Sequence, residues 1–292
     1  MATSRTVART TKPGTPTAPV RRLSLTDVIR GGKGLPPRIV FHGVGGIGKT
    51  SAAAQAEGAF FLLSPGETGL HTLIDAGLLP EVPSLEIGTW PDLLGIIDEL
   101  TTAETSRKNL VLDAIDGFEK LCNRHVRDTD YKGDGSEYGF EGYQRGYKTV
   151  ANGPWQELLS ALDRLRETRR MGIILLAHTG VGNFANPNGA DFNRYTPAMA
   201  KYSWELTFAW ADMVLFGQRE IVTVKEKGDR KPKGRGGSAR IISTEYDAIA
   251  DAKNRHNLPP EIDMGNSPVE AWANIQAAIA AGKNGNNKQE EK

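Results

Sequence analysis

A glycine-rich stretch close to the amino terminus contains the residues with the clearest chemistry. Gly43 and Gly48, separated by four residues and followed by Lys49-Thr50, fit the phosphate-loop pattern G-x-x-x-x-G-K-[ST] at every fixed position. Glycines let backbone N–H groups approach a polyphosphate, a helix N-terminus adds a favourable dipole, and the lysine reaches the β- and γ-phosphates. The pattern predicts an ATP site formed by Gly43, Val44, Gly45, Gly46, Ile47, Gly48, Lys49, Thr50 and Ser51.

A second stretch ends in a carboxylate that suits a metal ion. Residues 109–113 read Asn-Leu-Val-Leu-Asp, which is typical of a buried strand that ends in Asp113. In phosphate-loop proteins such an acid holds Mg²⁺, commonly through water, and the hydroxyl that follows the lysine ligates the ion. Asp116 competes for this role, but Asp116-Gly117-Phe118-Glu119 looks like a helix N-cap with an acid at N3. We therefore assign Thr50 and Asp113 to the metal and Asp116 to capping.

Two more polar side chains follow apolar stretches of strand length. Glu67 comes just after residues 59–63, and His178 ends the apolar run 172–177. The carboxyl ends of parallel strands meet at the sheet edge where ligands bind. We expect Glu67, or another acid, to orient the attacking water, and His178 to reach the γ-phosphate or that water. For His178, a hydrogen bond to a neighbouring strand without a part in the chemistry is an equal alternative.

Composition limits the class of protein. The 292 residues, 39% hydrophobic and 24% charged, are sufficient for one large α/β domain and are typical of a soluble globular protein. The net charge of +1 gives no overall attraction to nucleic acid. Cys122 is the only cysteine, which excludes an internal disulfide and fits a reducing compartment. Because the sequence has no apolar run of about 18 residues, we expect no membrane span and a cytoplasmic location.

Periodicity predicts the organisation of the chain. We expect a disordered basic arm over residues 1–22, a main domain over 23–265, a helix over 266–282 and a disordered tail over 283–292. In the main domain, apolar strands alternate with helices, which predicts an α/β fold whose mostly parallel sheet is covered on both faces and followed by a β-hairpin. The predicted strands are 38–43, 59–63, 85–87, 109–113, 172–177, 212–216, 221–225 and 240–243, and the main helices are 50–57, 91–103, 154–170 and 201–210.

Three segments have the composition of nucleic-acid contacts. Residues 128–153 interleave four tyrosines with Lys and Arg, which suits stacking on single-stranded bases. Residues 180–200 form a long Asn- and Gly-rich predicted loop, and residues 225–240 carry seven Lys/Arg less two acids, a local charge of +5. The alternatives are packing for the tyrosines and a plain solvated hairpin tip for the basic segment.

With these stretches in place, the sequence resembles RecA-like P-loop ATPases. More closely, it is similar to phage-encoded AAA/RecA-type nucleotide-binding proteins, which include RecA-like single-strand annealing proteins. The resemblance extends over about residues 38–262, with its most specific part in the phosphate loop. It implies a three-layer RecA-like fold with ATP and Mg²⁺ as cofactors.

The resemblance also extends to Lys253-Asn254-Arg255. This tripeptide resembles the K-x-R element that hexameric helicases and RecA-like filaments project into a neighbour's ATP site. It implies that Lys253 and Arg255 stabilise transition-state charge in trans, and that the active form is a homo-oligomer, either a ring or a filament.

These observations together predict an Mg²⁺-dependent ATPase that acts on single-stranded DNA in phage-type recombination or replication, by strand annealing or recombinase activity. A helicase loader or motor component is the nearest alternative. A nucleotide-gated binding protein with little hydrolysis is another. A small-molecule P-loop kinase is the third, but the basic hairpin and the K-x-R element fit it poorly.

Overall fold

Strands and helices alternate along the chain. The computed structural model of the protein describes residues 32, 34–186, 189–224 and 233–287, so the predicted arm over 1–22 and residues 225–232 of the basic segment lie outside the described residues. Within this part, no helix is both long enough and apolar enough to cross a bilayer. The elements are β1 (Arg38–Gly43), α1 (Lys49–Ala53), β2 (Ala59–Leu63), α2 (Gly69–Asp75), β3 (Ser84–Glu86), α3 (Trp90–Thr102), β4 (Asn109–Asp113), α4 (Ile115–Asp130), α5 (Arg145–Val150), α6 (Gln156–Arg169), β5 (Gly172–Ala177), β6 (Thr179–Phe184), β7 (Phe192–Pro197), α7 (Lys201–Trp210), β8 (Met213–Val224), β9 (Lys233–Ser243), β10 (Lys253–Asn254), β11 (Glu261–Asp263) and α8 (Pro268–Asn287).

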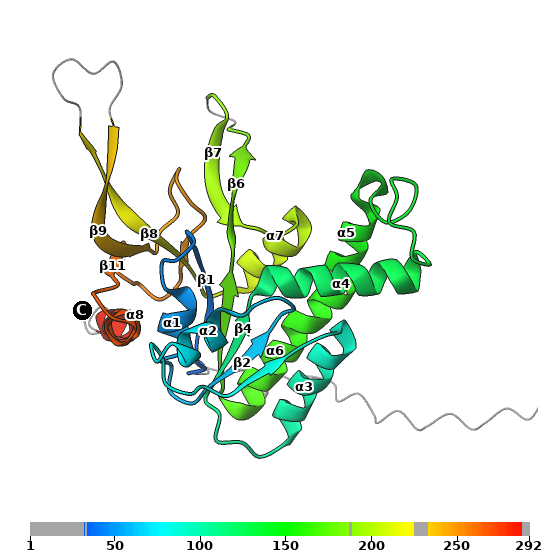
Figure 1. Ribbon diagram of the computed structural model, residues 1–292, viewed down its shortest axis with the longest axis horizontal. Coiled ribbons are helices and arrows are strands. Elements are labelled where there is room, and N and C mark those ends of the chain that lie inside the picture. Colours follow the sequence, from blue (N-terminus) through cyan, green and yellow to red (C-terminus); the bar gives the residue numbers. More distant parts are fainter. Residues whose placement is uncertain (1–31, 33, 187–188, 225–232, 288–292) are drawn as a thin grey trace, which may run out of the picture. The chain divides into compact units, whose positions relative to one another are not determined.

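Parallel strands form the centre of the main sheet (Figure 1). They are ordered β8-β1-β5-β4-β2-β3, and β9, β10 and β11 join on the β8 side by antiparallel pairing. β5 follows β4 in the chain but lies between β1 and β4 in the sheet. Helices cover both faces, so the predicted three-layer α/β fold with a mostly parallel sheet and a hairpin extension is confirmed.

Two apolar layers hold this sheet. Successive residues of a strand point to opposite faces. On one face, Val40 and Leu175 pack with the apolar residues of α3, α4 and α6, and on the other, Phe41 and Leu176 pack with those of α1 and α8. Each fully buried side chain of this size contributes roughly 1.5–3 kcal/mol relative to an exposed one.

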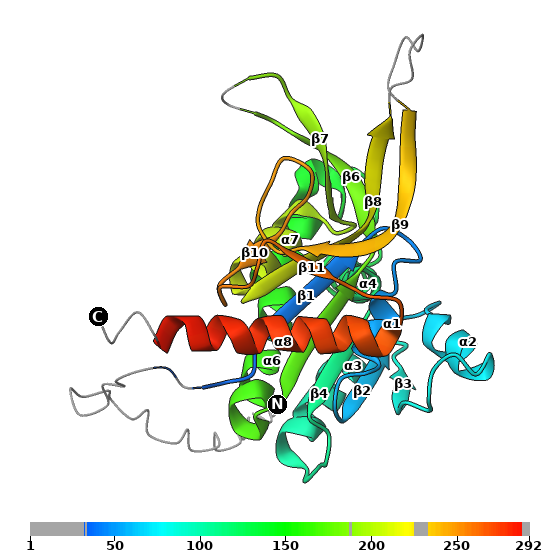
Figure 2. The same ribbon diagram turned by 90° about the vertical axis from the view of Figure 1, so that its left-hand side faces the viewer.

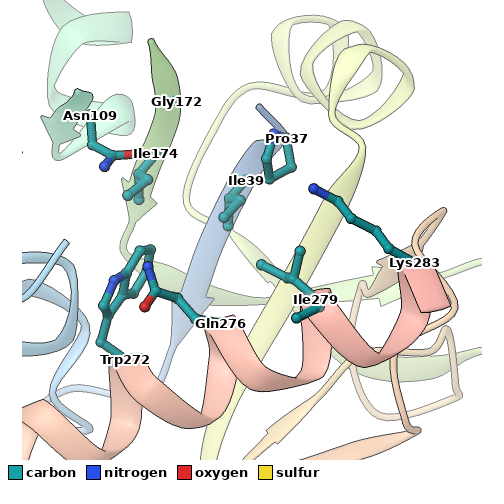
Figure 3. A pocket seen from close by; sticks show the side chains of 10 residues that line it. Pro37, Ile39, Asn109, Gly172, Ile174, Trp272, Gln276, Ile279 and Lys283 are labelled. Atoms are coloured by element: carbon teal, nitrogen blue, oxygen red, sulfur yellow. The ribbon is translucent and has the colours of Figure 1, made fainter. Parts of the chain in front are cut away.

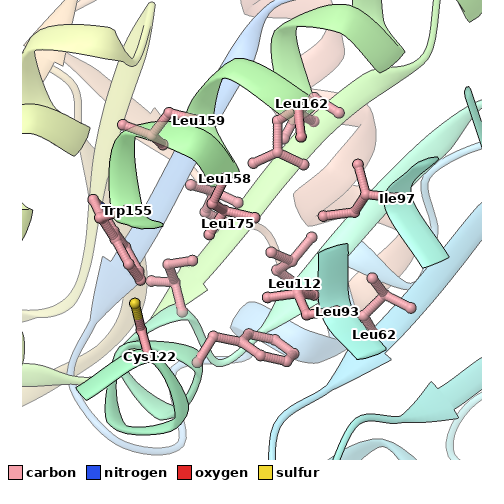
Figure 4. Packing of buried hydrophobic residues seen from close by; sticks show 14 of the residues in the cluster. Leu62, Leu93, Ile97, Leu112, Cys122, Trp155, Leu158, Leu159, Leu162 and Leu175 are labelled. Atoms are coloured by element: carbon pink, nitrogen blue, oxygen red, sulfur yellow. The ribbon is translucent and has the colours of Figure 1, made fainter. Parts of the chain in front are cut away.

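Figure 4 shows the first of these layers. Trp155, directly before α6, is fully buried and stacks on Trp90 with ring centroids 6.0 Å apart. Cys122 of α4 lies in the same layer. Burial raises the pKa of its thiol above the usual range, so Cys122 packs as a small apolar residue and is not an activated nucleophile.

The segment 180–200 forms a β-hairpin where the sequence predicts a loop. β6 and β7 pair antiparallel over six residue pairs, and the rings of Phe184 and Phe192 lie 5.1 Å apart across the strands. The Asn and Gly content favours a loop locally, whereas the cross-strand pairs that stabilise the hairpin are formed only in the folded chain. The hairpin begins directly after His178.

Two elements are longer than predicted. The predicted strands over 212–216 and 221–225 are one strand, β8, because β9 pairs with both halves across an irregularity between Arg219 and Ile221. The helix α8 continues to Asn287, beyond the predicted end at 282 and into the predicted tail. A Cβ at Gly282 would collide with the backbone of His256, so this glycine serves close packing and does not stop the helix.

The segment 128–153 is mostly helical and divides its tyrosines into two groups. The end of α4, a 3₁₀ turn at Gly142–Gln144, α5 and a π-helical turn at Ala151–Trp155 make up most of it. Tyr131 and Tyr147 pack edge-on against Phe140, with ring centroids 5.6 and 5.0 Å away. Tyr138 and Tyr143 are 83% and 92% exposed. Packing therefore accounts for two of the four tyrosines, and the other two are accessible to a ligand.

The helix α8 crosses one face of the sheet (Figure 2). The side chains of Trp272 and Ile275 are buried between α8 and the sheet. A cavity of about 280 Å³ remains between this helix and the first residues of β1, β4 and β5, with Ile39 and Ile279 in its walls (Figure 3). It lies at the amino-terminal edge of the parallel strands, so it is separate from the glycine-rich turn at their carboxyl-terminal edge.

A buried ion network joins the beginnings of β1 and β8. Asp212, directly before β8, accepts hydrogen bonds from Arg38 at 2.7 Å and Arg166 at 3.3 Å. The three side chains are only 12%, 17% and 14% exposed. Burial acts to raise the pKa of Asp212, but the hydrogen bonds and charge of Arg38 outweigh it and the pKa lies below its usual value. The network fixes two neighbouring strands next to each other.

Asp212→Ala is expected to lower the free energy of unfolding by about 3 kcal/mol, because it leaves two largely buried guanidinium groups without their shared carboxylate. Urea denaturation measures this. Glu205→Ala is the control, since Glu205 forms an exposed pair with Lys201 at 3.8 Å and should change stability by less than about 0.5 kcal/mol. Equal effects of the two substitutions would contradict a structural role for the buried network.

Candidate nucleotide site

The P-loop, residues 43–51, begins where β1 ends. Gly43 lies against Gly217 of β8, and a Cβ at Gly43 would collide with the carbonyl group of Gly217. Gly46 and Gly48 have φ angles of 71° and 104°, in the left-handed region that favours glycine. Three glycines of the motif are therefore required by the local geometry of the turn.

The remaining P-loop residues hold this turn in place. The backbone N–H of Val44 donates to the carbonyl oxygen of Gly217 at 3.0 Å. Ile47 is fully buried in the apolar layer beneath α8. Gly45 is exposed, and Ser51 is half-buried in the first turn of α1. The loop is thus anchored on both sides, with Gly45 and Gly46 at the surface.

Lys49 and Thr50 open α1 and face the acids of the site. Lys49 Nζ donates to the carbonyl oxygen of Gly43 at 3.1 Å. Thr50 Oγ1 donates to Asp113 Oδ2 at 2.8 Å. β1 and β4 are not neighbours in the sheet, so this hydrogen bond passes over the end of β5. The structure therefore brings together the hydroxyl and the carboxylate that the sequence assigns to the metal.

Burial shifts the pKa values of the central charged groups. It raises the pKa of Asp113 to about 6, with a further contribution from the charge of Glu67, against the hydrogen bond from Thr50 and the charge of Lys49. It lowers the pKa of Lys49, against the attraction of Asp113 and Asp116. Both groups are thus held in surroundings that disfavour their own charge, and a bound ion of opposite charge would relieve this cost.

Asp116 takes part in the site and does not cap a helix, contrary to the sequence assignment. Ala114 is the N-cap of α4, and Asp116 lies buried in the first turn of that helix. Asp116 accepts a hydrogen bond from the backbone N–H of His178 at 3.0 Å and from His178 Nδ1 at 3.1 Å. The N-cap pattern is local in sequence, whereas His178 is 62 residues away and is brought close by the insertion of β5 beside β4.

His178 connects two acids. Its Nε2 lies 3.7 Å from Glu67 Oε1, on the side of the ring opposite to Asp116. The hydrogen bond to Asp116 raises the pKa of His178, against the effect of burial, and the charge of Glu67 adds to the rise. Burial acts to raise the pKa of Asp116, but the hydrogen bonds from His178 outweigh it and lower that pKa. The structure thus places Glu67, His178 and Asp116 in one row next to Lys49.

A buried histidine directly precedes the P-loop and hydrogen-bonds to two other segments of the chain. His42, the residue before Gly43, is fully buried, and burial lowers its pKa to about 4. Its Nε2 donates to the carbonyl oxygen of Asp251 at 2.7 Å, which leaves Nδ1 to accept from Thr179 Oγ1 at 3.1 Å. Because Thr179 is the first residue of β6, a neutral His42 connects the P-loop strand with the start of the β6–β7 hairpin.

Lys253 and Arg255 lie away from this chain's own P-loop. Lys253 pairs with Val214 near the beginning of β8, while the P-loop follows the opposite end of the neighbouring strand. Its Nζ donates to the carbonyl oxygens of Phe208 and Ala209 at the end of α7, and burial lowers its pKa to about 8. The Arg255 side chain is 52% exposed and lies 4.0 Å from Asp212. Neither residue belongs to the site of its own chain.

One residue of the site is missed by motif reasoning. Arg240 of β9 donates from Nη1 to the carbonyl oxygen of Ile47 at 3.4 Å. The sequence places Arg240 in the basic segment 225–240, which is expected to contact DNA. No motif connects it with the P-loop, because the contact requires the antiparallel return of β9 along β8.

Comparison with known proteins gives two matches. A family model described as "AAA domain" matches residues 35–256. The crystal structure of the RadB recombinase is among the solved structures that match, with 11% sequence identity and a TM-score of 0.39, covering 72% of this chain and 81% of that chain. No curated protein sequence matches the chain.

Asp113→Asn is expected to stabilise the protein in the absence of Mg²⁺ and nucleotide. A carboxylate whose pKa rises to about 6 on folding lowers the stability of the wild type as pH rises from about 4 to about 6. At pH 8 the asparagine variant should therefore be more stable by up to about 3 kcal/mol, and at pH 5 by less. Urea denaturation in EDTA at the two pH values measures the difference.

Asp98→Asn, the same change at an exposed residue of α3, is the control and should change the free energy of unfolding by less than about 0.5 kcal/mol. A destabilised Asp113→Asn protein at pH 8 would contradict the unfavourable burial of this carboxylate.

Proposed function

The chain belongs to the family that the AAA-domain model describes, and on this premise we propose that it is an Mg²⁺-dependent ATPase that acts on single-stranded DNA as a homo-oligomer. The hydrogen bond from Thr50 to Asp113 is the observation that carries the proposal. It joins a hydroxyl of α1 to a carboxylate at the end of β4, and these are the two oxygen donors that would hold the metal of a phosphate-loop site.

The two oxygen donors of the site are suited to Mg²⁺. They are too few for a metal ion that takes all its ligands from the protein. Thr50 Oγ1 and Asp113 Oδ2 are hard oxygen donors, which Mg²⁺ prefers, and Mg²⁺ commonly takes its other ligands from water and phosphate. No cluster of three or more His, Cys, Asp or Glu ligands occurs among the described residues. When bound, the ion would neutralise charge on the β- and γ-phosphates, and Lys49 would contact the same phosphates from the P-loop.

Glu67, His178 and Asp116 are suited to the hydrolytic step. Asp116 fixes the ring of His178, and its negative charge favours the imidazolium form, which can donate to a γ-phosphate oxygen. Glu67 Oε1, 3.7 Å from His178 Nε2, is available to accept a proton from an attacking water. In this assignment His178 binds and orients, and Glu67 acts as the base.

The β6–β7 hairpin is the proposed route from the site to DNA. It begins at the residue after His178, and Thr179 is hydrogen-bonded to His42 beside the P-loop. The exposed rings of Tyr138 and Tyr143 offer surfaces on which bases can stack. The hairpin, the segment 128–153 and the basic segment 225–240 are therefore the proposed DNA contacts, in the recombination or replication role that the resemblance to phage proteins implies.

ATP turnover with and without single-stranded DNA tests the proposal. We expect the wild type to hydrolyse ATP with a requirement for Mg²⁺ and to be stimulated at least severalfold by single-stranded DNA. Lys49→Ala should lower turnover by about 100-fold or more, because it removes the cation that contacts the transferred phosphoryl group. Lys108→Ala, at an exposed lysine directly before β4 and thus at the edge of the sheet opposite to the P-loop, is the matched control.

Unchanged turnover in Lys49→Ala would contradict the site assignment. Turnover without DNA stimulation would favour the kinase or the nucleotide-gated binding protein. Transfer of phosphate to a small molecule in place of water would identify the kinase.

Mixing two inactive variants tests the role of Arg255 in trans. Arg255→Ala should leave ATP binding nearly intact and stop hydrolysis, because the arginine would act on a neighbour's site. A mixture with Lys49→Ala should regain activity, since an Arg255→Ala subunit retains a complete P-loop and its neighbour retains the arginine. Activity is measured as a function of mixing ratio. If no ratio restores turnover, Arg255 has no role in trans.

A further inference from the structure

We propose that Arg240 is a positioning residue of the nucleotide site that acts within its own chain, holding the P-loop in place and supplying positive charge for the polyphosphate. The inference deepens the proposed function and rests on it. Arg240 is thereby assigned to the ATP site and not to the DNA contacts. It lies on the side of the P-loop opposite to Asp113, Asp116 and Glu67.

The position of Arg240 is set by three segments that meet at the P-loop. Its Nη1 donates to the carbonyl oxygen of Ile47, and its Nη2 donates to that of Gly265 at 2.9 Å. Its own carbonyl oxygen accepts from the N–H of Met264 at 2.9 Å. A Cβ at Gly48 would lie 3.1 Å from Nη1, so the guanidinium occupies the space that this glycine leaves open. Arg240 therefore joins β9, the P-loop and the turn before α8.

The charge of Arg240 has no acidic partner among the residues that the structure describes. Arg38 and Arg166 are paired with Asp212, and Arg194 with Asp251 at 2.8 Å. Arg169, by contrast, donates to the carbonyl oxygens at the end of α3, where the helix dipole favours a cation. Arg240 is also partly buried, but its described hydrogen bonds go to carbonyl oxygens. A partly buried cation without a carboxylate is costly, and an anionic ligand would offset that cost.

The sheet order puts this charge where the acids cannot neutralise it. The acids near Lys49 are Asp113, Asp116 and Glu67, from β4, α4 and the turn after β2, all on the β5 side of β1. Arg240 approaches from the other side, where β8 and then β9 lie next to β1. In Figure 2, α8 begins beside α1, which brings the turn at Gly265 to the same place. A polyphosphate in the P-loop would thus have Lys49 and the metal on one side and Arg240 on the other.

The test compares nucleotide binding by Arg240→Gln, Arg240→Lys and Arg219→Gln, each in the full chain. Arg219 is the matched control because it is paired with Arg240 across the β8–β9 hairpin and is exposed. Calorimetry gives the Kd for ATP, ADP and AMP at low and high salt, and thermal unfolding without nucleotide reports the fold.

Arg240→Gln is expected to weaken ATP binding about tenfold, as expected for the loss of one charge-assisted interaction. ADP should be affected less and AMP least, because the effect follows ligand charge, and the salt dependence of Kd should become shallower. Arg240→Lys should recover part of the affinity, since it retains charge without the planar guanidinium. Arg219→Gln should bind ATP within twofold of the wild type.

ATP affinity that is unchanged in Arg240→Gln would overturn the proposal. So would an equal loss for ATP and AMP with unaltered salt dependence, which is the result of a purely structural contact. If Arg240→Gln does not fold, Arg240→Lys decides: a loss of affinity that is equal for ATP and AMP and the same at low and high salt overturns the proposal. Failure of the wild type to bind ATP, or full binding by Lys49→Ala, would instead refute the nucleotide site itself.

Discussion

The register of three parallel strands determines the rest of the site. His42 of β1 lies opposite Ala177 of β5, and Leu176 of β5 lies opposite Asp113 of β4, so the three strands end at one level. At this level the P-loop, His178 and Asp113 follow one another across the sheet. A shift of one residue in either pairing would turn every side chain of a strand to the opposite face. Burial of both faces in apolar layers opposes such a shift. The core therefore fixes the relative positions of the P-loop, His178 and Asp113.

The site concentrates charge that the protein does not fully neutralise. Burial raises the pKa of Asp113 and lowers that of Lys49, while Arg240 approaches the P-loop without an acidic partner among the described residues. By contrast, the network around Asp212 at the other edge of the sheet is satisfied by its own arginines. The first arrangement is suited to binding a charged ligand, and the second to holding strands together. The same residue types thus serve binding at one edge and stability at the other.

Hydrogen bonds beside the P-loop connect the site with the elements that follow β5. His178 contacts Asp116 and Glu67, and the next residue, Thr179, contacts the buried His42. These hydrogen bonds therefore connect the residue before the P-loop with the first residue of the β6–β7 hairpin. Because His42 stays neutral over the physiological pH range, this connection does not depend on a titration of its own.

The sequence by itself determined the P-loop, the strand that ends in Asp113, the alternation of strands and helices, and the position of His178. Each of these depends on short-range spacing: a glycine pattern, an apolar run or a helical period. The tertiary structure decided the β6–β7 hairpin, the extension of α8, the role of Asp116 and the approach of Arg240. These depend on partners far away in the chain, as in the contact of Asp116 with a histidine 62 residues later. Local patterns carry no information on such partners, because a sheet order that inserts β5 between β1 and β4 exists only once the chain has folded.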